Sequence, residues 1–265
     1  MDDLAALRLQ IEWGADEALD EAPFDRLRPT PPPGPLPQGE GEVLAATPPP
    51  PAGGARAEGT RTTPAARAFE AAAAAGSLPD LRAAIAGFDG CALRDTASNL
   101  VFAEGDPSSG LLLIGDAPGA DEDRSGTPFA GAAGAYLDKM LASIVLKRSD
   151  LLLTPLIPWR PPGDRPPSPA ELAICLPFLA RLIAIAAPRR LVLFGPLALR
   201  TLVSQAPRRR QRGAWIDVAV PGLDRPLPAL PTSSPAELIR SARDRRAAWA
   251  DLRLLRRTLD VLDGK

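Results

Sequence analysis

The chain has 265 residues, of which 45% are hydrophobic and 24% charged, enough to bury a core in one sizeable domain or two small ones. Its net charge of −1 indicates no particular partner. The absence of histidine excludes histidine acid–base catalysis, Ser-His-Asp and Cys-His nucleophile systems and histidine metal sites. Two cysteines are too few for a disulfide framework, and they favour a cytoplasmic location.

The N-terminal arm is predicted to be separate from the globular part. Residues 1–28 contain a short amphipathic helix, with Leu4, Leu7 and Ile11 at helical spacing among acidic residues. We interpret this helix either as a frayed or docked end or as a motif that binds a protein partner. Residues 29–64 are rich in proline and glycine and have almost nothing apolar to bury, so we expect a disordered linker rather than a ligand for SH3-like domains.

Signals for export or membrane insertion are not expected in this chain. The N-terminal residues lack the basic region and the apolar run of a signal peptide. The sequence also contains no uninterrupted stretch of 18 apolar residues, so we expect no membrane span.

Residues 65–265 are predicted to form one domain in which strands and helices alternate. Four short apolar runs suit buried parallel strands, at Leu111–Gly115, Leu151–Thr154, Leu191–Gly195 and Pro228–Pro231. Helical patterns occur at Ala65–Ala75, Leu78–Ala86, Ala132–Val145, Pro169–Ala186, Pro196–Ser204 and Asp244–Leu262. This order predicts an α/β fold, a three-layer α/β/α sandwich around a central four-stranded, mainly parallel sheet. Ligands of such folds bind at the carboxyl ends of the strands.

The end of the first strand carries the first candidate site residues. Gly115 and Ala117 flank Asp116, a carboxylate at the strand terminus, and Phe129 follows in a loop beside Pro128. Glycine lets the backbone approach a ligand closely, and an aromatic ring in such a loop can face a pocket. Taken singly, these residues also fit a simpler interpretation as a turn aspartate and a core phenylalanine.

Basic residues follow the second and fourth strands. Arg160 and Arg165 lie in a proline-stiffened loop, which suits phosphate contacts but also suits a rigid surface loop with solvated charges. Arg240 ends a short segment after the fourth strand. The remaining late arginines are compatible with a polyanion partner or with a solvated helix face; they are Arg208, Arg209, Arg210, Arg212, Arg243, Arg245 and Arg246.

Six segments after Leu81 carry a stronger signal in combination than any of them does alone. They are FDGCALRDTASNLVFAEGD, LLLIGDAPGADEDRSGTPFAGAAGAYLDKML, WRPPGDRPPSPAELAICLPFL, LVLFG, RGAW and PTSSPAELIRSARDRRAAWADL. Their order and spacing resemble the family 4 uracil-DNA glycosylases of the proteobacterial type. The resemblance implies a base-excision-repair protein that binds DNA through its phosphates and flips uracil into a pocket. There an aromatic ring stacks on the base, an amide reads its edge, a carboxylate positions water, and a histidine stabilises the developing charge.

Carried over position by position, the resemblance keeps part of that site and changes the rest. Phe129 matches the stacking aromatic, and Asp116 stands where the family has glutamate, so a shorter carboxylate is kept. Pro155 replaces the base-reading asparagine, and Ser234 replaces the histidine. The resemblance thus implies catalytic roles for Asp116 and Ser234, base contacts for Gly115, Ala117, Phe129 and Pro155, and DNA contacts for Arg160, Arg165, Leu238 and Arg240.

The resemblance also implies the remnant of an iron–sulfur site. The family often holds a 4Fe-4S cluster with four cysteines; Cys91 and Cys175 match two of them, whereas Phe88 and Trp159 occupy the other two positions. Because a cluster normally takes four thiolates, we expect no cofactor and no metal, with the two aromatic rings filling the space.

Three functional hypotheses follow. The first is a DNA-binding member of the repair lineage whose uracil excision is weak, altered or lost. The second is an active glycosylase that hydrolyses the N-glycosidic bond of uracil or another damaged base with Asp116. The third is a non-catalytic scaffold that binds DNA or a partner protein. We expect DNA as the partner, a monomer, no membrane contact, and any protein partner at the N-terminal helix.

Overall fold

A mixed six-stranded sheet lies at the centre of the computed structural model, which describes residues 62–203 and 213–262. The strand order is β1-β3-β2-β4-β6-β5. The inner strands β3 (Leu152–Pro155), β2 (Leu111–Gly115), β4 (Arg190–Phe194) and β6 (Leu227–Thr232) are all parallel. They are the four strands that the sequence predicts, and no end differs from the prediction by more than one residue.

Two short antiparallel strands, β1 (Glu104–Gly105) and β5 (Ile216–Val218), pair with β3 and β6 at the two edges of the sheet. The prediction of a four-stranded sheet is therefore wrong in the strand count. Strands of two and three residues are too short for a run of apolar residues or an alternation to identify them, so the pattern that located the inner strands could not find them.

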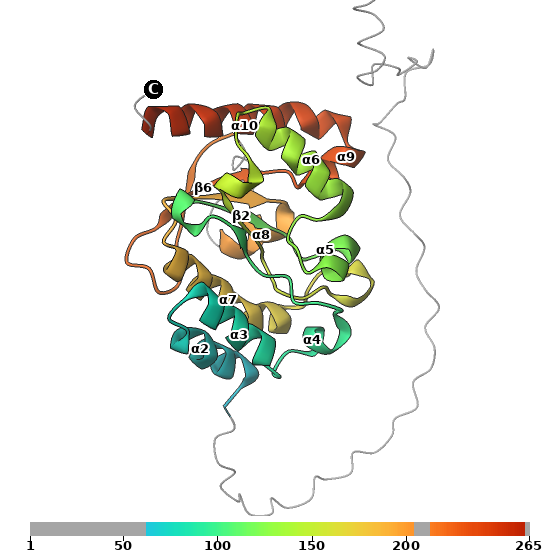
Figure 1. Ribbon diagram of the computed structural model, residues 1–265, viewed down its shortest axis with the longest axis vertical. Helices are drawn as coiled ribbons and strands as arrows, with labels where there is room; N and C mark the ends of the chain where they lie inside the picture. Colours follow the sequence, from blue (N-terminus) through green and yellow to red (C-terminus); the bar gives the residue numbers. More distant parts are fainter. Residues whose placement is uncertain (1–61, 204–212, 263–265) are drawn as a thin grey trace, which may run out of the picture. The chain divides into compact units, whose positions relative to one another are not determined.

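Helices cover both faces of the sheet and complete the predicted three layers (Figure 1). One layer contains α2 (Pro64–Ala74), α3 (Leu78–Gly87), α4 (Ala92–Thr96), α7 (Pro169–Ala186) and α8 (Pro196–Leu202). The other contains α6 (Gly131–Ala142), α9 (Pro235–Arg240) and α10 (Ala242–Leu262). The short helix α5 (Ala120–Ser125) follows β2.

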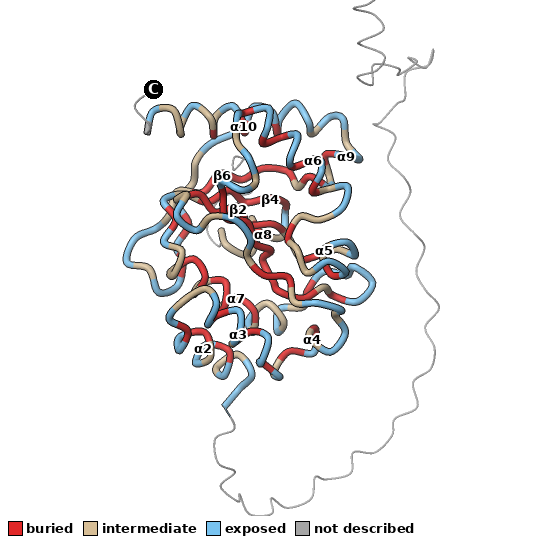
Figure 2. The backbone as a smooth tube through the Cα atoms, viewed as in Figure 1, coloured by how far each residue is buried: buried red, intermediate tan, exposed pale blue. Residues whose placement is uncertain are grey.

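Strand β2 shows how one sequence supplies two cores. Leu112 and Ile114 pack into the layer of α2, α3 and α7, whereas Leu111 and Leu113 pack into the layer of α6 and α10. Successive side chains of a strand point to opposite faces, so a strand that is covered on both sides must be apolar throughout. Figure 2 shows the result as a buried sheet between helices whose outer faces are exposed.

The long helix α7 is held by contacts at both ends. Ser168 and Glu171 form a capping box at its start, in which each side chain accepts a hydrogen bond from the other residue's backbone N–H. Near its end, the Arg181 guanidinium donates two hydrogen bonds, of 2.8 and 2.6 Å, to the carbonyl oxygen of Ala75, which follows α2. Among the described helices, α7 alone is long and apolar enough to cross a membrane, but its packing against α2 and α3 explains that composition as a core helix.

The predicted helix in residues 1–28 lies outside the described residues, as does all but the last three residues of the predicted linker at 29–64. The same holds for Arg208, Arg209, Arg210 and Arg212. Helix α2 begins at Pro64, one residue before the predicted helix start, with the Thr63 hydroxyl accepting a hydrogen bond from the backbone N–H of Ala66.

Replacing Arg181 with methionine should lower the free energy of unfolding by about 1.5–3 kcal/mol, because the carbonyl of Ala75 loses a charged donor. Urea unfolding measures the change. Arg82→Met on the exposed face of α3 is the control, and it should change stability by less than about 0.5 kcal/mol. Equal effects of the two variants would contradict the proposed link between α2 and α7.

Candidate active site

The candidate site lies where the connections from β2 and β4 diverge. The chain leaves β2 towards β3 on one side, and it leaves β4 towards β6 on the other. Such a switch point opens a crevice at the carboxyl ends of the strands, which is where ligands of α/β folds bind. Asp116 follows β2 at this point, and Gly195 follows β4.

Asp116 bridges the two strands by binding the start of α8. Its Oδ1 atom accepts a hydrogen bond of 2.8 Å from the backbone N–H of Ala198. Its carboxylate also lies directly against Gly195, which has a φ of +98°; a Cβ atom there would be 2.3 Å from Oδ2. Glycine at 195 is thus required both by the backbone angle and by the carboxylate beside it.

Burial raises the pKa of Asp116 from 3.8 to about 6. The negative charge of Glu237 adds to this shift, whereas the backbone N–H groups of Ala198 and Leu197 oppose it. A carboxyl group with such a pKa is partly protonated in mildly acidic solution and ionised at neutral pH, where it can accept a proton from water.

Phe129 covers the end of β2 with its ring. The ring lies edge-to-face against Phe194, with centroids 5.7 Å apart, and its Cζ atom would be 2.8 Å from a Cβ atom at Gly115. The residue has a φ of +52°, which is unusual for a side chain of this size. Gly115 therefore gives the aromatic ring the space that the resemblance assigns to a stacking residue.

One arginine fixes the backbone of that loop. Arg148 donates hydrogen bonds to the carbonyl oxygens of Pro128 (3.1 Å), Phe129 (2.9 Å) and Gly134 (3.3 Å), and its Nε atom pairs with Asp138. These contacts stabilise the loop in which Phe129 adopts its left-handed conformation.

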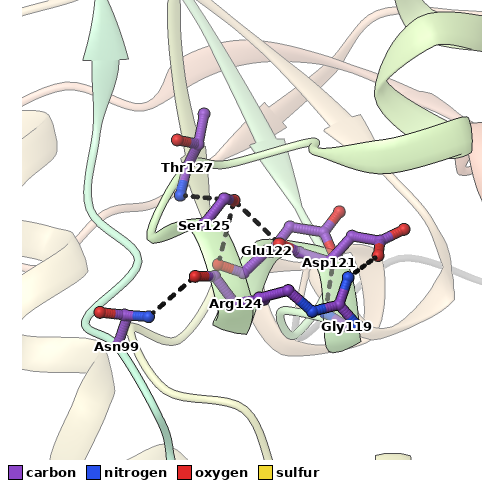
Figure 3. Close-up of polar contacts among 7 residues, drawn as sticks. All are labelled: Asn99, Gly119, Asp121, Glu122, Arg124, Ser125 and Thr127. Atoms are coloured by element: carbon purple, nitrogen blue, oxygen red, sulfur yellow. Dashed lines mark hydrogen bonds and ion pairs between the residues drawn. The ribbon is translucent and has the colours of Figure 1, made fainter.

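The segment that leads to this loop is braced by its own polar contacts (Figure 3). Glu122 accepts a hydrogen bond from the backbone N–H of Gly119, and Arg124 pairs with Asp121 at 3.0 Å. The Asn99 amide donates to the carbonyl oxygen of Arg124, which ties α5 to a segment well before it in the chain. These contacts fix the position of α5, which carries Glu122.

The cavity between these elements has a volume of about 50 Å³. It brings together Asp116 and all four predicted base-binding residues; the lining residues are Gly115, Asp116, Ala117, Pro118, Glu122, Pro128, Phe129 and Pro155. Pro155 is the buried last residue of β3, paired in register with Gly115. The polar side chains of this lining are the carboxylates of Asp116 and Glu122.

Ser234 does not line the cavity. Its hydroxyl accepts a hydrogen bond of 3.2 Å from the backbone N–H of Glu237, and the Glu237 carboxylate accepts one of 3.1 Å from the N–H of Ser234. This capping box starts α9 and brings the Glu237 charge near Asp116. Sequence reasoning missed both Glu122 and Glu237, although their position three residues after a helix N-cap was a readable signal.

The predicted DNA-contacting residues differ in their exposure. Arg160 pairs with Asp164 at 2.7 Å within the loop, and Arg165 makes a two-pronged pair with Glu171 in the first turn of α7 at 2.8 and 2.6 Å, so each charge has a nearby carboxylate. Arg240 is exposed.

Leu238 is 1% exposed and packs into the core beside α10, so a direct DNA contact by this residue is not compatible with the structure. Its neighbour Ile239 is 40% exposed instead. On the short helix α9 the two residues are turned roughly 100° apart, and the inward one is Leu238.

Comparison with known proteins agrees with this arrangement. The family described as the uracil DNA glycosylase superfamily matches residues 102–253, which include the whole cavity lining. The chain belongs to the uracil-DNA glycosylase superfamily. Similar relatives are type-4 uracil-DNA glycosylases, from Pyrobaculum aerophilum (36% identical over 51% of this chain and 69% of the relative) and Archaeoglobus fulgidus (39%, over 46% and 61%). A third, from Thermotoga maritima, is 35% identical over 43% of this chain and 59% of the relative.

The cysteine site of this superfamily member holds two thiols among aromatic side chains. Cys91 and Cys175 are buried, and a hydrogen bond from the Cys175 thiol lowers the pKa of Cys91 to about 7. Phe88 and Trp159 are 6% and 2% exposed, and Phe88 lies edge-to-face against Phe178 at 5.4 Å. A 4Fe-4S cluster takes four thiolates, so this donor set does not fit one. The described residues contain no group of three or more His, Cys, Asp or Glu side chains placed to hold a metal ion.

The pKa of Asp116 predicts how this member of the superfamily responds to pH. The folded-state pKa lies above 3.8, so the folded protein binds this proton more tightly than the unfolded chain does. The contribution of Asp116 to stability is therefore full below pH 3.8 and is lost as pH rises through about 6. The variant Asp116→Asn keeps an acceptor for Ala198 but does not titrate. Its free energy of unfolding, relative to the wild type, should rise between these two pH values.

Chemical unfolding over this pH range measures the difference between the two proteins. Asp106→Asn is the control: hydrogen bonds from Ser108 lower the pKa of Asp106 below 3.8, so its contribution to stability changes below this pH range and its difference from the wild type should stay nearly constant within the range. A constant difference between Asp116→Asn and the wild type across the range would contradict the raised pKa.

Proposed function

We propose that this protein binds DNA and that its excision of uracil is weak, altered or lost. The observation that carries the proposal is the chemistry of the cavity: its polar side chains are two carboxylates, with neither an amide nor an imidazole among the lining residues. The relatives' names describe uracil-DNA glycosylases, and this chain spans between about half and two thirds of their length, so their activity comes to it as a hypothesis.

Base recognition is the first function that the substitutions affect. The uracil edge offers both hydrogen-bond donors and acceptors, and a pocket that reads it needs a group able to pair with both. Pro155, at the position where the resemblance places the reading amide, has no side-chain donor or acceptor, and it lies buried against Gly115. A base entering here would leave its polar edge unpaired, which costs free energy in a buried site.

Departure of the base is the second function that the substitutions affect. Ser234 stands at the position of the family's histidine, and its hydroxyl already binds the backbone of Glu237. Nearby charge is unfavourable as well, because Glu237 would repel the negative charge that builds on a leaving base. Loss of one hydrogen bond of this kind lowers a rate by about 10²–10³.

The size of the cavity supports the same conclusion. A volume of about 50 Å³ is far below the ~300 Å³ at which small-molecule sites begin. Entry of a base would require the Phe129 ring to move, and Arg148 holds the loop that carries it. The lack of an assembled pocket favours altered or lost excision.

The DNA-binding part of the proposal rests on the surface formed by α9 and the start of α10. Ile239, Arg240, Arg243 and Arg246 are all exposed. Arg245 donates to the carbonyl oxygens of Leu238 and Ile239 and so fixes the end of α9. An exposed apolar side chain among exposed arginines suits a nucleic-acid strand, since the arginines can neutralise phosphates.

An active glycosylase is the second candidate, and one observation favours it. Asp116 faces a cavity roofed by an aromatic ring and has a pKa of about 6, as a general base for neutral pH should. A pocket widened by movement of Phe129 could then accept a damaged base other than uracil. A scaffold role centred on the predicted N-terminal helix is the third hypothesis. In each case we place the protein in the cytoplasm as a monomer.

We also propose that the protein carries no iron–sulfur cluster, since two of the four ligand positions are aromatic. Purified protein should be colourless and should contain neither iron nor acid-labile sulfide in stoichiometric amounts. A brown protein with cluster absorbance, lost in a Cys91→Ser variant, would overturn this part of the proposal.

Excision itself is tested on single- and double-stranded oligonucleotides that contain one uracil, with alkaline cleavage of abasic sites as the readout. We expect little or no product from the wild type. The double variant Pro155→Asn, Ser234→His should gain activity, by about 10²–10³ if the restored histidine supplies its hydrogen bond.

Three further results of this assay are informative. Robust product from the wild type that is abolished by Asp116→Ala would establish the active glycosylase in place of our proposal. Activity on another damaged base with none on uracil would support altered specificity. No gain in the double variant would show that the closed cavity, rather than the two substitutions, blocks excision.

DNA binding is tested by fluorescence anisotropy with a double-stranded oligonucleotide at several salt concentrations. Affinity should fall steeply with salt, and Arg240→Gln should weaken binding and reduce the salt slope by about one unit. Arg160→Gln should have a smaller effect, because Asp164 already balances that charge. Arg82→Gln, on the opposite layer, is the control for net charge. Absent or salt-independent binding would favour the scaffold hypothesis.

A further inference from the structure

A second cavity lies at the amino ends of the parallel strands, whereas Asp116 lies at their carboxyl ends. It opens where β2 and β4 begin and has a volume of about 160 Å³. Three arginines line it, namely Arg189, Arg190 and Arg256, together with the carboxylate of Asp150. Strands β2 and β4 have five residues each, so about 16 Å separates their amino ends from the candidate active site at their carboxyl ends. The two cavities are therefore distinct.

Gly110 makes room for the first of these arginines. Its carbonyl oxygen accepts hydrogen bonds from the backbone N–H groups of both Arg189 (2.8 Å) and Arg190 (3.1 Å), which fixes the start of β4 beside it. Gly110 has a φ of +73°, and a Cβ atom there would be 2.7 Å from Nε of Arg189. The Arg189 side chain therefore lies across the glycine, at the mouth of the cavity, and it is exposed.

Arg190 is oriented by an aromatic ring rather than by a carboxylate. Its guanidinium carbon lies 5.7 Å from the centre of the Trp215 ring, a cation–π contact. The Trp215 indole N–H donates to the Thr258 hydroxyl at 3.0 Å, which in turn donates to a carbonyl oxygen of α10. Arg190 is thus held in place with its hydrogen-bond donors still available.

The charge in this cavity is not balanced by its own lining. Asp150 is the one acidic residue among the lining residues, against three arginines. Arg256 pairs with Asp260, one turn further along α10, whereas Arg189 and Arg190 form no ion pair with any described residue. Two guanidinium groups without carboxylate partners in a concave site favour an anion with several oxygens, because a guanidinium can give such an anion two parallel hydrogen bonds.

The size and the remaining walls narrow the class of anion. A volume of about 160 Å³ leaves room for an organic group beside a phosphate. Leu146 and Leu259 supply an apolar wall beside the arginines. A phosphate attached to an organic group would use both the charged and the apolar parts of the lining.

We infer that the cavity between Arg189, Arg190 and Arg256 is a binding site for a phosphate group carried by an organic molecule. Two sources share this chemistry: a free nucleotide-like phosphate compound, and the backbone of a nucleic-acid strand. The site does not depend on the function proposed for Asp116, since it uses different residues at the other edge of the sheet.

The experiment uses the full chain, with inorganic pyrophosphate and a thymidine oligonucleotide as separate probes. Isothermal titration calorimetry measures the affinity of each. Modification of arginines by phenylglyoxal, followed by peptide mass spectrometry, reports which side chains the probe covers. Pyrophosphate should bind with millimolar affinity or better and should protect Arg189, Arg190 and Arg256. Arg189→Gln should weaken binding about tenfold or more, because one charged hydrogen bond is lost.

The controls distinguish binding at a specific site from general attraction between the anion and a positively charged surface. Arg82→Gln removes the same charge on the opposite layer and should leave the affinity for pyrophosphate unchanged. Arg256→Gln gives a second variant within the cavity, and circular dichroism verifies that each variant is folded. Competition between the probes then identifies the source: mutual displacement indicates a nucleic-acid phosphate, and binding of pyrophosphate alone indicates a free phosphate compound.

Two results would overturn the inference. The first is no binding of either probe at millimolar concentration. The second is an equal loss of affinity in Arg189→Gln and Arg82→Gln, with no protection of the three arginines. Both results are distinguishable from a failure of the function proposed above, which concerns uracil excision and the surface around Arg240.

Discussion

The contact between Asp116 and the start of α8 is the interaction on which the site depends. It joins the ends of β2 and β4, the two strands between which the topology opens a crevice. The carboxylate meets the backbone N–H of Ala198 and lies flat against Gly195. The raised pKa of Asp116 follows from this burial, and the same carboxylate lines the small cavity beside the Phe129 ring.

Three polar residues that the resemblance assigns to the site or to DNA contacts are engaged by a neighbour within the fold. Asp116 caps α8, Ser234 caps α9, and Arg165 pairs with Glu171. Each contact is a structural use of a side chain that could otherwise meet a ligand. Local hydrogen bonds of this kind compete with a ligand for the same atoms, so a polar side chain at a site position does not by itself establish a role in binding or catalysis.

The sequence was sufficient for the inner sheet and the main helices, because strands covered on both faces must be apolar throughout, as Leu111–Gly115 is. It was not sufficient for β1 and β5, which are too short to leave a pattern. The burial of the Leu238 side chain could not be predicted from the sequence either, since a helix of six residues has no reliable periodicity. The cavity residues were predicted from the resemblance, whereas the engagement of Ser234 by Glu237 was missed although the Ser-x-x-Glu spacing is that of a capping box.

Gly195 limits which residues can occupy position 116. Because the carboxylate at 116 occupies the space that any side chain at 195 would need, neither residue can change freely while the other stays the same. A longer acid at position 116 has one more methylene group, which would have to fit against the turn between β4 and α8. A residue larger than glycine at position 195 would have to displace the acid. Two positions far apart in the chain are therefore sterically coupled. Across the superfamily, we expect substitutions at the first to be accompanied by adjustments at the second.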